Sequence, residues 1–424
     1  MIEKLLNNEN LNLAYNKVLI NKGSGGVDGM QVADLKDYLD THGTKIKEQI
    51  RKGSYQPGPI KGVEIPKGNG KMRLLGIPTV VDRLIHQSLH QVLEPLFEPD
   101  FQPYSYGFRP NRNAQQAVLQ SQLNINEGYQ DVIDIDLKSF FDEVDHSKLV
   151  DLVYDKVKCK QTLQLLRRIL KAPIQIKGKL YKRRKGVPQG SPLSPLLSNI
   201  LLNELDKELG KRGHSYVRYA DDFSIYVKSK MAAQRVGNSI SKFLKDRLSL
   251  PINHEKSGIR KPLTFELLGY GFVSNYKKGE KGKYQLIVSK KKWKRLKERL
   301  KALSRKTIPM TFDERITRLN WLIRGWTNYF KLASIQSKLK KIDEWLRNRL
   351  RYCIWHDWKK RDRKRKNLIR LGIKQGKAYA WSRSRMGGWR IAQSPILGTT
   401  ITIERLKSRG YLSMVEYYHK TRLS

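Results

Sequence analysis

The stretch that decides the fold is Ser215–Val227, which reads SYVRYADDFSIYV. Two β-prone apolar runs flank the tetrapeptide Tyr219-Ala220-Asp221-Asp222, and this arrangement predicts a hairpin whose tip carries two adjacent carboxylates. Adjacent anions repel each other and are costly to hold on a rigid turn. A divalent cation would offset that cost, whereas an isolated Asp-Asp pair is as easily a solvated turn. A third carboxylate upstream favours the cation.

The third carboxylate lies at the end of an expected strand. Residues 131–137 read DVIDIDL and alternate with a period of two, which indicates a half-buried strand. Ile133 and Ile135 share one face, and Asp134 and Asp136 share the other. We expect Asp136 to meet the hairpin tip and Asp134, further from the strand end, to make a structural hydrogen bond.

Three carboxylates at one place predict a metal site for phosphoryl transfer. Two Mg²⁺ ions, roughly 3.5–4 Å apart, would clamp the attacking and leaving oxygens of an in-line displacement. Mn²⁺ can substitute for Mg²⁺. The expected catalytic residues are Asp136, Asp221 and Asp222. The expected metal ligands are Asp136, Leu137, Asp221 and Asp222, with Asp136 and Asp221 as the primary ligands.

The Asp-x-x-x-x-Phe strand end and the Tyr-Ala-Asp-Asp hairpin together resemble the palm of a reverse transcriptase. Further motifs resemble those of the bacterial group II intron reverse transcriptase/maturase family, in the same order and over nearly the whole chain. They are GVDG at 26–29, RLLGIP at 73–78, SYGFRP at 105–110, GVPQGSPLSP at 186–195, NHEKS at 253–257, LLGYGF at 267–272 and RGWTNYF at 324–330. The set is very specific, although several of its members would be weak alone.

The resemblance implies an α+β fold shaped as a right-hand polymerase, with fingers and palm made of antiparallel sheet and helices, a helical thumb and a small basic C-terminal domain. We expect fingers and palm in 1–285, the thumb or maturase domain X in 286–358, and a basic DNA-binding domain in 359–424. Eight of the twelve residues from Lys290 to Lys301 are basic, on a predicted amphipathic helix. Seven of the eight residues from Lys359 to Lys366 are basic, which predicts a linker or a phosphate-binding arm.

The same resemblance assigns residues to the substrates. The expected nucleotide-binding residues are Lys67, Arg73, Phe141, Gln189 and Lys256, with Phe141 as the steric gate that excludes a 2′-hydroxyl. The expected primer grip comprises Leu268, Gly269 and Tyr270. From their charge and position rather than from the resemblance, we expect template and RNA to be bound by Arg109, Arg112, Lys291, Lys292 and Arg295. A surface role remains the alternative for Arg109 and Arg112. A basic solvated hairpin remains the alternative for Lys67 and Arg73, and a core aromatic the alternative for Phe141.

The composition indicates a polyanionic partner. The chain has 84 Lys and Arg residues against 39 Asp and Glu residues, a formal net charge of +45. This excess favours nucleic acid over a membrane surface, because no apolar run approaches 18 residues. Cys159 and Cys353 offer neither a disulfide framework nor a thiolate zinc site. We expect a cytoplasmic protein of a bacterium, associated with RNA or the nucleoid.

The chain departs from many family members at its C-terminal end. It has no Cys pair, and after residue 356 its only His is His419, so we expect no endonuclease domain and a group IIC-like member. The main hypothesis is an RNA-directed DNA polymerase that also binds its intron RNA, assists splicing and retrohoming, and uses dNTPs, an RNA template, a DNA primer and a DNA target. A splicing-only maturase and a domesticated reverse transcriptase for repair or phage defence remain alternatives.

Overall fold

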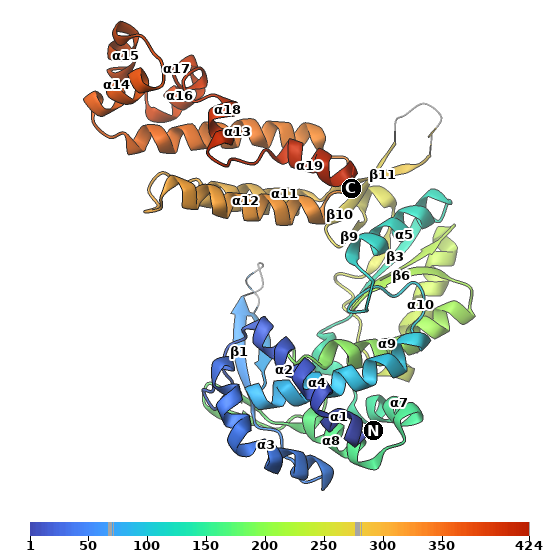
Figure 1. Cartoon of the computed structure of the whole chain (residues 1–424). Coiled ribbons are helices and arrows are strands. Elements are labelled where there is room, and N and C mark those ends of the chain that lie inside the picture. The colour runs from blue at the N-terminus through green and yellow to red at the C-terminus, as the bar shows by residue number, and fades with distance from the viewer. Residues whose placement is uncertain (67–69, 71, 276–279, 281, 424) are drawn as a thin grey trace. The chain divides into compact units, whose positions relative to one another are not determined.

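The computed structural model describes residues 1–66, 70, 72–275, 280 and 282–423, and these form two compact units, 1–261 and 262–424 (Figure 1). Each unit is described by itself. The predicted boundaries at 285 and 358 remain predictions. Among the described residues, no helix combines the length and the apolar character needed to cross a bilayer.

The first unit combines helices with two sheets. Its helices are α1 (Ile2–Leu6), α2 (Asn8–Asn21), α3 (Leu35–Arg51), α4 (Val80–Phe97), α5 (Ala114–Asn126), α6 (Phe140–Glu143), α7 (His146–Val157), α8 (Lys160–Lys171), α9 (Ser194–Lys211) and α10 (Lys230–Leu248). Its strands are β1 (Ile60–Pro66), β2 (Met72–Ile77), β3 (Asp131–Asp136), β4 (Ile174–Ile176), β5 (Lys179–Tyr181), β6 (Ser215–Tyr219), β7 (Asp222–Val227) and β8 (Gly258–Arg260).

The sheet that carries the acidic motifs has the order β6-β7-β3-β8, and all of its pairs are antiparallel. The period-two prediction for β3 is confirmed, because Ile133 and Ile135 are buried whereas Asp134 and Asp136 are half-buried. Helix α10 packs on the apolar face, where a Cβ at Gly237 would lie 3.6 Å from Ile133. Hydrophobic burial on this face fixes which side the aspartates occupy.

The second sheet of this unit has the order β2-β1-β4-β5 and forms the predicted hairpin at β1 and β2. The pair β1–β4 is parallel, so the sheet is mixed rather than purely antiparallel. The turn between β1 and β2 includes Lys67, which lies outside the described residues. Helix α9 begins at Ser194 with Leu193 as its N-cap, and the Ser194 hydroxyl donates to the Pro188 carbonyl 2.7 Å away.

The second unit begins with a three-stranded sheet in the order β11-β10-β9 and continues as helices. The strands are β9 (Glu266–Leu267), β10 (Tyr270–Ser274) and β11 (Tyr284–Val288). The helices are α11 (Lys290–Leu303), α12 (Phe312–Tyr329), α13 (Gln336–Asp357), α14 (Arg361–Arg370), α15 (Gln375–Ser382), α16 (Gly388–Gln393), α17 (Pro395–Gly398), α18 (Ile403–Ser408) and α19 (Met414–Leu423).

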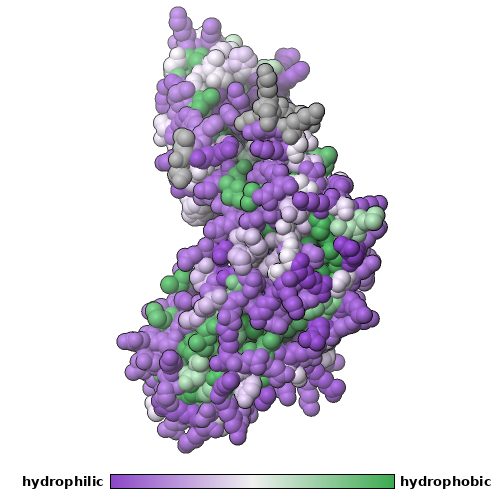
Figure 2. Space-filling model, turned by 90° about the vertical axis from the view of Figure 1, so that its right-hand side faces the viewer, coloured by the Kyte–Doolittle hydropathy of each residue, from purple (hydrophilic) through white to green (hydrophobic). Residues whose placement is uncertain are grey.

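The basic run Lys359–Lys366 is not an irregular linker, and its predicted binding of phosphate remains a prediction. Most of it belongs to helix α14, which packs against α15 and buries Leu368 completely. Its exposed cations are solvated, Lys364 Nζ lies 4.5 Å from the centroid of the Trp355 ring, and Arg365 lies 3.9 Å from Asp362, which reduces the repulsion among them. Figure 2 shows one face of the chain, on which hydrophilic residues predominate.

Candidate active site

The two acidic motifs lie side by side in the central sheet. Strand β3 pairs with β7 so that Asp136 stands directly opposite Asp222. Strand β6 pairs with β7 so that Tyr219 stands opposite Asp222, which leaves Ala220 and Asp221 as a two-residue turn. The predicted meeting of the upstream strand end with the hairpin is therefore confirmed. Asp222 belongs to the strand rather than to the tip, and only Asp221 occupies the turn.

The end of β3 is held by the segment that follows α10. The main-chain N–H of Asp136 donates to the Ser257 hydroxyl at 3.0 Å, and the Asn253 N–H donates to the Asp136 carbonyl at 2.8 Å. Lys256, between them, places its Nζ 3.2 Å from Asp136 Oδ2. The Asn253–Ser257 motif thus fixes the backbone of Asp136 and sets an ammonium beside its carboxylate.

A second basic side chain, that of Arg260, pairs with Asp134, which lies two residues before Asp136 in β3. The Arg260 guanidinium, on β8, donates from Nε to Asp134 Oδ2 at 2.8 Å. The same guanidinium donates from Nη2 to the Lys256 carbonyl at 2.6 Å. Asp134 therefore makes the structural interaction that its position predicted, and Arg260 ties it to the segment that holds Asp136.

The carboxylates of this region repel one another. The pKa of Asp222 is raised to about 6. The larger cause is desolvation by the surrounding protein, and the second is the negative charge of Asp221, Asp136 and Asp134. The Lys256 ammonium acts in the opposite direction but does not cancel the effect. Like charges directly opposite each other in a sheet are unfavourable. An added cation would relieve this repulsion.

The donor set suits a hard divalent cation, which prefers carboxylate and carbonyl oxygens. Asp136, Asp221 and Asp222 supply carboxylates, and Leu137, whose side chain is buried, has only its main-chain carbonyl to offer. Among the described residues no group of three or more His, Cys, Asp or Glu side chains already forms a metal-binding cluster. In this arrangement the carboxylate of Asp136 is paired with the ammonium of Lys256.

One loop joins three of the residues predicted to bind nucleotide. Residues 186–190 run past α6, where the Val187 N–H donates to the Phe141 carbonyl at 2.7 Å. They then reach β2, where the Gly76 N–H donates to the Gln189 carbonyl at 2.9 Å and Arg73 donates from Nε to the Gln189 side-chain oxygen. The structure thus brings Arg73 to Gln189 directly and connects Phe141 to them through this loop.

The loop depends on glycine at two points. Gly186 has φ +87°, and a Cβ there would lie 2.9 Å from the carbonyl oxygens of Phe141 and Asp142. Gly190 has φ +128°, and a Cβ there would lie 2.6 Å from the Gly76 carbonyl. Glycine therefore permits both the left-handed backbone and the close approach of the loop to α6 and β2.

Arg109, a predicted template contact, is engaged within its own loop in this structure. Its guanidinium is buried, donates to Glu98 Oε1 from Nε at 2.9 Å and from Nη2 at 2.8 Å, and donates from Nη1 to the carbonyls of Gln102 at 2.7 Å and Ser105 at 2.9 Å. To reach a phosphate, Arg109 would have to give up its ion pair with the half-buried Glu98, so its role at the template remains a prediction. Arg112 is half-buried, donates to the Pro103 carbonyl at 3.1 Å, and remains a predicted template contact.

The predicted primer grip is a tight turn in the second unit. Leu268 and Gly269 join β9 to β10 with φ of +54° and +88°. Tyr270 is buried and donates its hydroxyl to the Tyr329 carbonyl, while the Tyr329 hydroxyl donates to the Leu268 carbonyl at 2.9 Å. The side chain of Lys292 lies so close that a Cβ at Gly269 would meet its Cε at 2.6 Å.

A groove of about 1060 Å³ runs between α11 and α12 in the second unit. Two of the predicted RNA-binding residues, Lys292 and Arg295, line it together with Arg299, Arg318 and the exposed Trp321. Lys291 is exposed on the same helix but is not among the lining residues. A groove that combines several basic side chains with an exposed indole suits a nucleic acid, since basic side chains bind phosphates and an aromatic ring can stack on a base.

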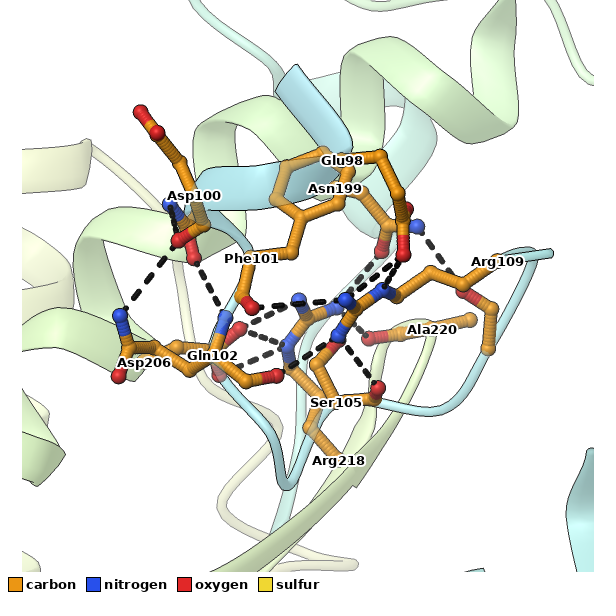
Figure 3. A network of polar contacts seen from close by, with 12 residues as sticks. Glu98, Asp100, Phe101, Gln102, Ser105, Arg109, Asn199, Asp206, Arg218 and Ala220 are labelled. Atoms are coloured by element: carbon orange, nitrogen blue, oxygen red, sulfur yellow. Dashed lines mark hydrogen bonds and ion pairs between the residues drawn. The ribbon is translucent and has the colours of Figure 1, made fainter. Parts of the chain in front are cut away.

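Arg218 is a residue of the site that the motifs did not reveal. It precedes Tyr219 in β6, is completely buried, and pairs with the equally buried Asp206 on α9 (Figure 3). Its position could have signalled this role. Arg218 stands opposite Phe223, and Tyr216 opposite Ile225, so the period-two pattern places this arginine on the apolar face of the sheet.

The comparisons with known proteins agree with this geometry. Residues 65–272 match the family described as reverse transcriptase (RNA-dependent DNA polymerase), and residues 293–372 match the group II intron maturase-specific domain. The chain is 34% identical to protein YkfC of Escherichia coli (strain K12) over 272 residues, which are 55% of this chain and 71% of YkfC. The chain belongs to the group II intron reverse transcriptase/maturase family.

Two further similarities are more distant. The group II intron-encoded protein LtrA of Lactococcus lactis subsp. cremoris is 28% identical over 310 residues, which are 58% of this chain and 51% of LtrA. A structure titled partial Cas6-RT-Cas1--Cas2 complex has 25% sequence identity and a TM-score of 0.38, and the match covers 58% of this chain and 41% of that one.

Family membership confirms three of the predictions. The chain is an α+β protein with a reverse transcriptase domain, the class of enzyme is RNA-directed DNA polymerase, and a maturase-specific domain follows. The reverse transcriptase domain family uses divalent metal ions and acts on nucleic acid. The chain spans about half the length of LtrA, so the substrates and partners of this reverse transcriptase belong to the proposal below.

Proposed function

We propose that this reverse transcriptase extends a DNA primer on an RNA template, with Asp136, Asp221 and Asp222 as its catalytic carboxylates. The observation that carries the proposal is the register of β3 and β7, which sets Asp136 opposite Asp222 and next to the turn bearing Asp221. We assign two Mg²⁺ ions to these residues and to the Leu137 carbonyl, with Mn²⁺ as a substitute. When bound, the ions would stabilise negative charge on the attacking and leaving oxygens.

The protein's own groups position the nucleotide. Lys256, whose one ion pair among the described residues is the largely exposed contact with Asp136, would be available to pair with a phosphate when a metal ion neutralises Asp136. Arg73 and Gln189 form a polar edge supplied by two different elements. Phe141, fixed at its carbonyl by Val187, supplies the bulk that would exclude a ribose 2′-hydroxyl. The predicted preference for dNTPs rests on this side chain.

The second unit supports a second role, in which the protein binds folded intron RNA and assists splicing and retrohoming. The specific observation is the groove between α11 and α12, whose lining combines Trp321 with three basic residues that pair with no acidic side chain among the described residues, Lys292, Arg295 and Arg299. The maturase-specific domain match covers these helices. The predicted DNA-target contact of residues 359–424 belongs to the same proposal. A splicing-only protein would not need the paired carboxylates.

Primer extension on an RNA template tests the main proposal. Purified protein is supplied with a DNA primer, Mg²⁺, and either dNTPs or rNTPs, and Asp221→Ala serves as the inactive control. We expect extension with dNTPs, little with rNTPs, and none by the variant. Wild-type protein that makes no DNA under these conditions would refute the polymerase, while intact intron-RNA binding in the same preparation would favour the splicing role alone.

A further inference from the structure

Arg218 occupies a position where a charge is costly. Its side chain and that of Asp206 are both 0% exposed, although each has a charge to keep. Buried ion pairs of this kind can often be replaced by apolar residues without loss of stability, so their presence calls for a further reason. Among the described residues Arg83, Arg109 and Arg315 are also buried, but each keeps some exposed surface, of 8%, 9% and 3%. Arg218 keeps none and is separated only by Tyr219 from the turn that carries Asp221.

The contacts of the guanidinium divide between an anchor and the turn (Figure 3). On the anchor side, Nε donates to both Asp206 oxygens at 2.9 Å and Nη2 donates to Asp206 Oδ2 at 2.5 Å. On the turn side, Nη1 donates to the Ala220 carbonyl at 3.0 Å and to Asn199 Oδ1 at 2.9 Å. Both Asp206 and Asn199 lie on α9, a helix with a largely buried surface. The guanidinium therefore ties the turn to a rigid helix.

The turn itself is strained and confined from the other side. Ala220 has φ +57°, a left-handed backbone that non-glycine residues adopt only when their surroundings enforce it. Gly107 lies against it, since a Cβ at Gly107 would be 2.3 Å from the Ala220 nitrogen. Asn199 connects the two sides, because its Nδ2 donates to the Gly107 carbonyl at 2.9 Å. Ala220 is thus clamped between Arg218 and Gly107.

The segment that bears Gly107 is fixed in its turn. The Arg218 N–H donates to the Tyr104 carbonyl and the Tyr106 N–H donates to the Arg218 carbonyl, both at 2.9 Å. The buried Arg109 guanidinium binds the carbonyls of Gln102 and Ser105 from inside this loop. The guanidiniums of Arg218 and Arg109 therefore fix the two segments that pack against the Ala220 turn. A lysine could keep the charge at 218, but a single ammonium cannot span Asp206, Asn199 and the Ala220 carbonyl.

We propose that Arg218 is a positioning residue for catalysis, which acts through the Ala220 carbonyl to hold Asp221 and Asp222 where they bind the metal. This inference rests on the proposed polymerase function. Misplacement of a reacting group by 1 Å can cost about 100-fold in rate. Loss of a residue that orients a metal ligand costs about 10–100-fold in metal affinity or activity. Both effects should follow when the fork of Arg218 is lost and the charge is kept.

The main test compares Arg218→Lys with wild-type protein. We expect kcat for dNTP incorporation to fall about 100-fold with KM for dNTP little changed, and Mn²⁺ binding followed by electron paramagnetic resonance to weaken about tenfold. Tyr226→Phe is the matched control. It removes a buried hydroxyl that contacts Ser121 on α5 and Ser224 on β7 at 2.7 and 2.8 Å, and Tyr226 lies near the end of β7 that is remote from the turn. It should lower the melting temperature but leave kcat and Mn²⁺ affinity unchanged.

A second variant covers the case in which Arg218→Lys does not fold. Gly107→Ala keeps every charge and pushes on Ala220 from the opposite side, and it should reproduce the loss of kcat and of Mn²⁺ affinity. A folded Arg218→Lys or Gly107→Ala protein with wild-type kcat and Mn²⁺ affinity would overturn the positioning role. Should wild-type protein make no DNA, the polymerase proposal fails. Mn²⁺ affinity alone then decides the positioning role, and equal values in wild type and variants overturn it.

Discussion

Acid should destabilise this protein through one buried imidazole, that of His86 on α4. The side chain is buried, and its Nδ1 lies 2.9 Å from the Ser191 hydroxyl, at the end of the loop that carries Gln189. Its Nε2 has no hydrogen-bond partner among the described residues. A protonated ring would carry an N–H with no acceptor in an apolar site. Burial accordingly lowers the pKa of His86 to about 3.

The sign of the pH effect follows from the direction of this shift. The unfolded chain binds a proton on His86 near pH 6.5, and the folded chain does not bind it until about pH 3. The folded state is therefore favoured above pH 6.5 and loses stability as the pH falls below that value. Between pH 7 and pH 5 the loss from this residue amounts to about 2 kcal/mol.

Urea unfolding at pH 7 and at pH 5 measures this effect. His86→Gln keeps a polar partner for Ser191 but cannot titrate, so its free energy of unfolding should fall by about 2 kcal/mol less than that of the wild type over the same interval. His42→Gln, at an exposed histidine on α3, controls for the loss of a histidine and should behave as wild type. Parallel pH dependences for wild type and His86→Gln would refute the reasoning.

Three further predictions concern the site and the second unit. Asp221→Ala should abolish DNA synthesis yet leave RNA affinity nearly unchanged in a filter-binding assay, because one carboxylate contributes little to a broad cationic surface; a large loss of RNA binding would contradict it. Phe141→Ala should admit rNTPs, and unchanged dNTP selectivity in primer extension would exclude the gate. Asp343→Asn should cost roughly 3 kcal/mol and increase hydrogen exchange in α19, because the buried carboxylate accepts from Tyr411, Ser413, Met414 and Val415 at 2.7–3.0 Å. Unaltered exchange in α19 would show that this helix is held elsewhere.

Local patterns were sufficient to predict the acidic hairpin and the strand beside it. Period-two alternation in 131–137 fixes which side chains share a face, and a two-residue turn between β-prone runs fixes the hairpin. The pairing of β3 with β7 follows once both strands bury one apolar face. The helices α11 to α13 were predictable for a similar reason, since their apolar stripes recur at helical spacing despite the basic residues between them.

The departures from expectation concern basic residues, because charge alone does not determine which partner a side chain finds. Arg109 was assigned to template, and in this structure it binds Glu98 and two carbonyls inside its own loop. The run 359–366 was assigned to a linker or a phosphate-binding arm, and most of it lies in helix α14, which Leu368 anchors. In both cases the deciding partner is a residue whose contact depends on the tertiary fold. The excess of cations indicated a polyanionic partner correctly but could not assign each cation to it.

The contrast between Arg109 and Arg218 shows when the partner of a basic residue can be predicted from the sequence. Arg109 lies in a loop, where no periodic pattern indicates its direction. Arg218 lies in a strand, opposite Phe223, on a face whose other members are apolar. An arginine on such a face must find an anion in the core, and the only acid of the buried stripe of α9 that could serve is Asp206. Because that same strand ends at the turn bearing Asp221, the pair connects the core to the carboxylates, and the cost of burying it is most simply explained by that connection.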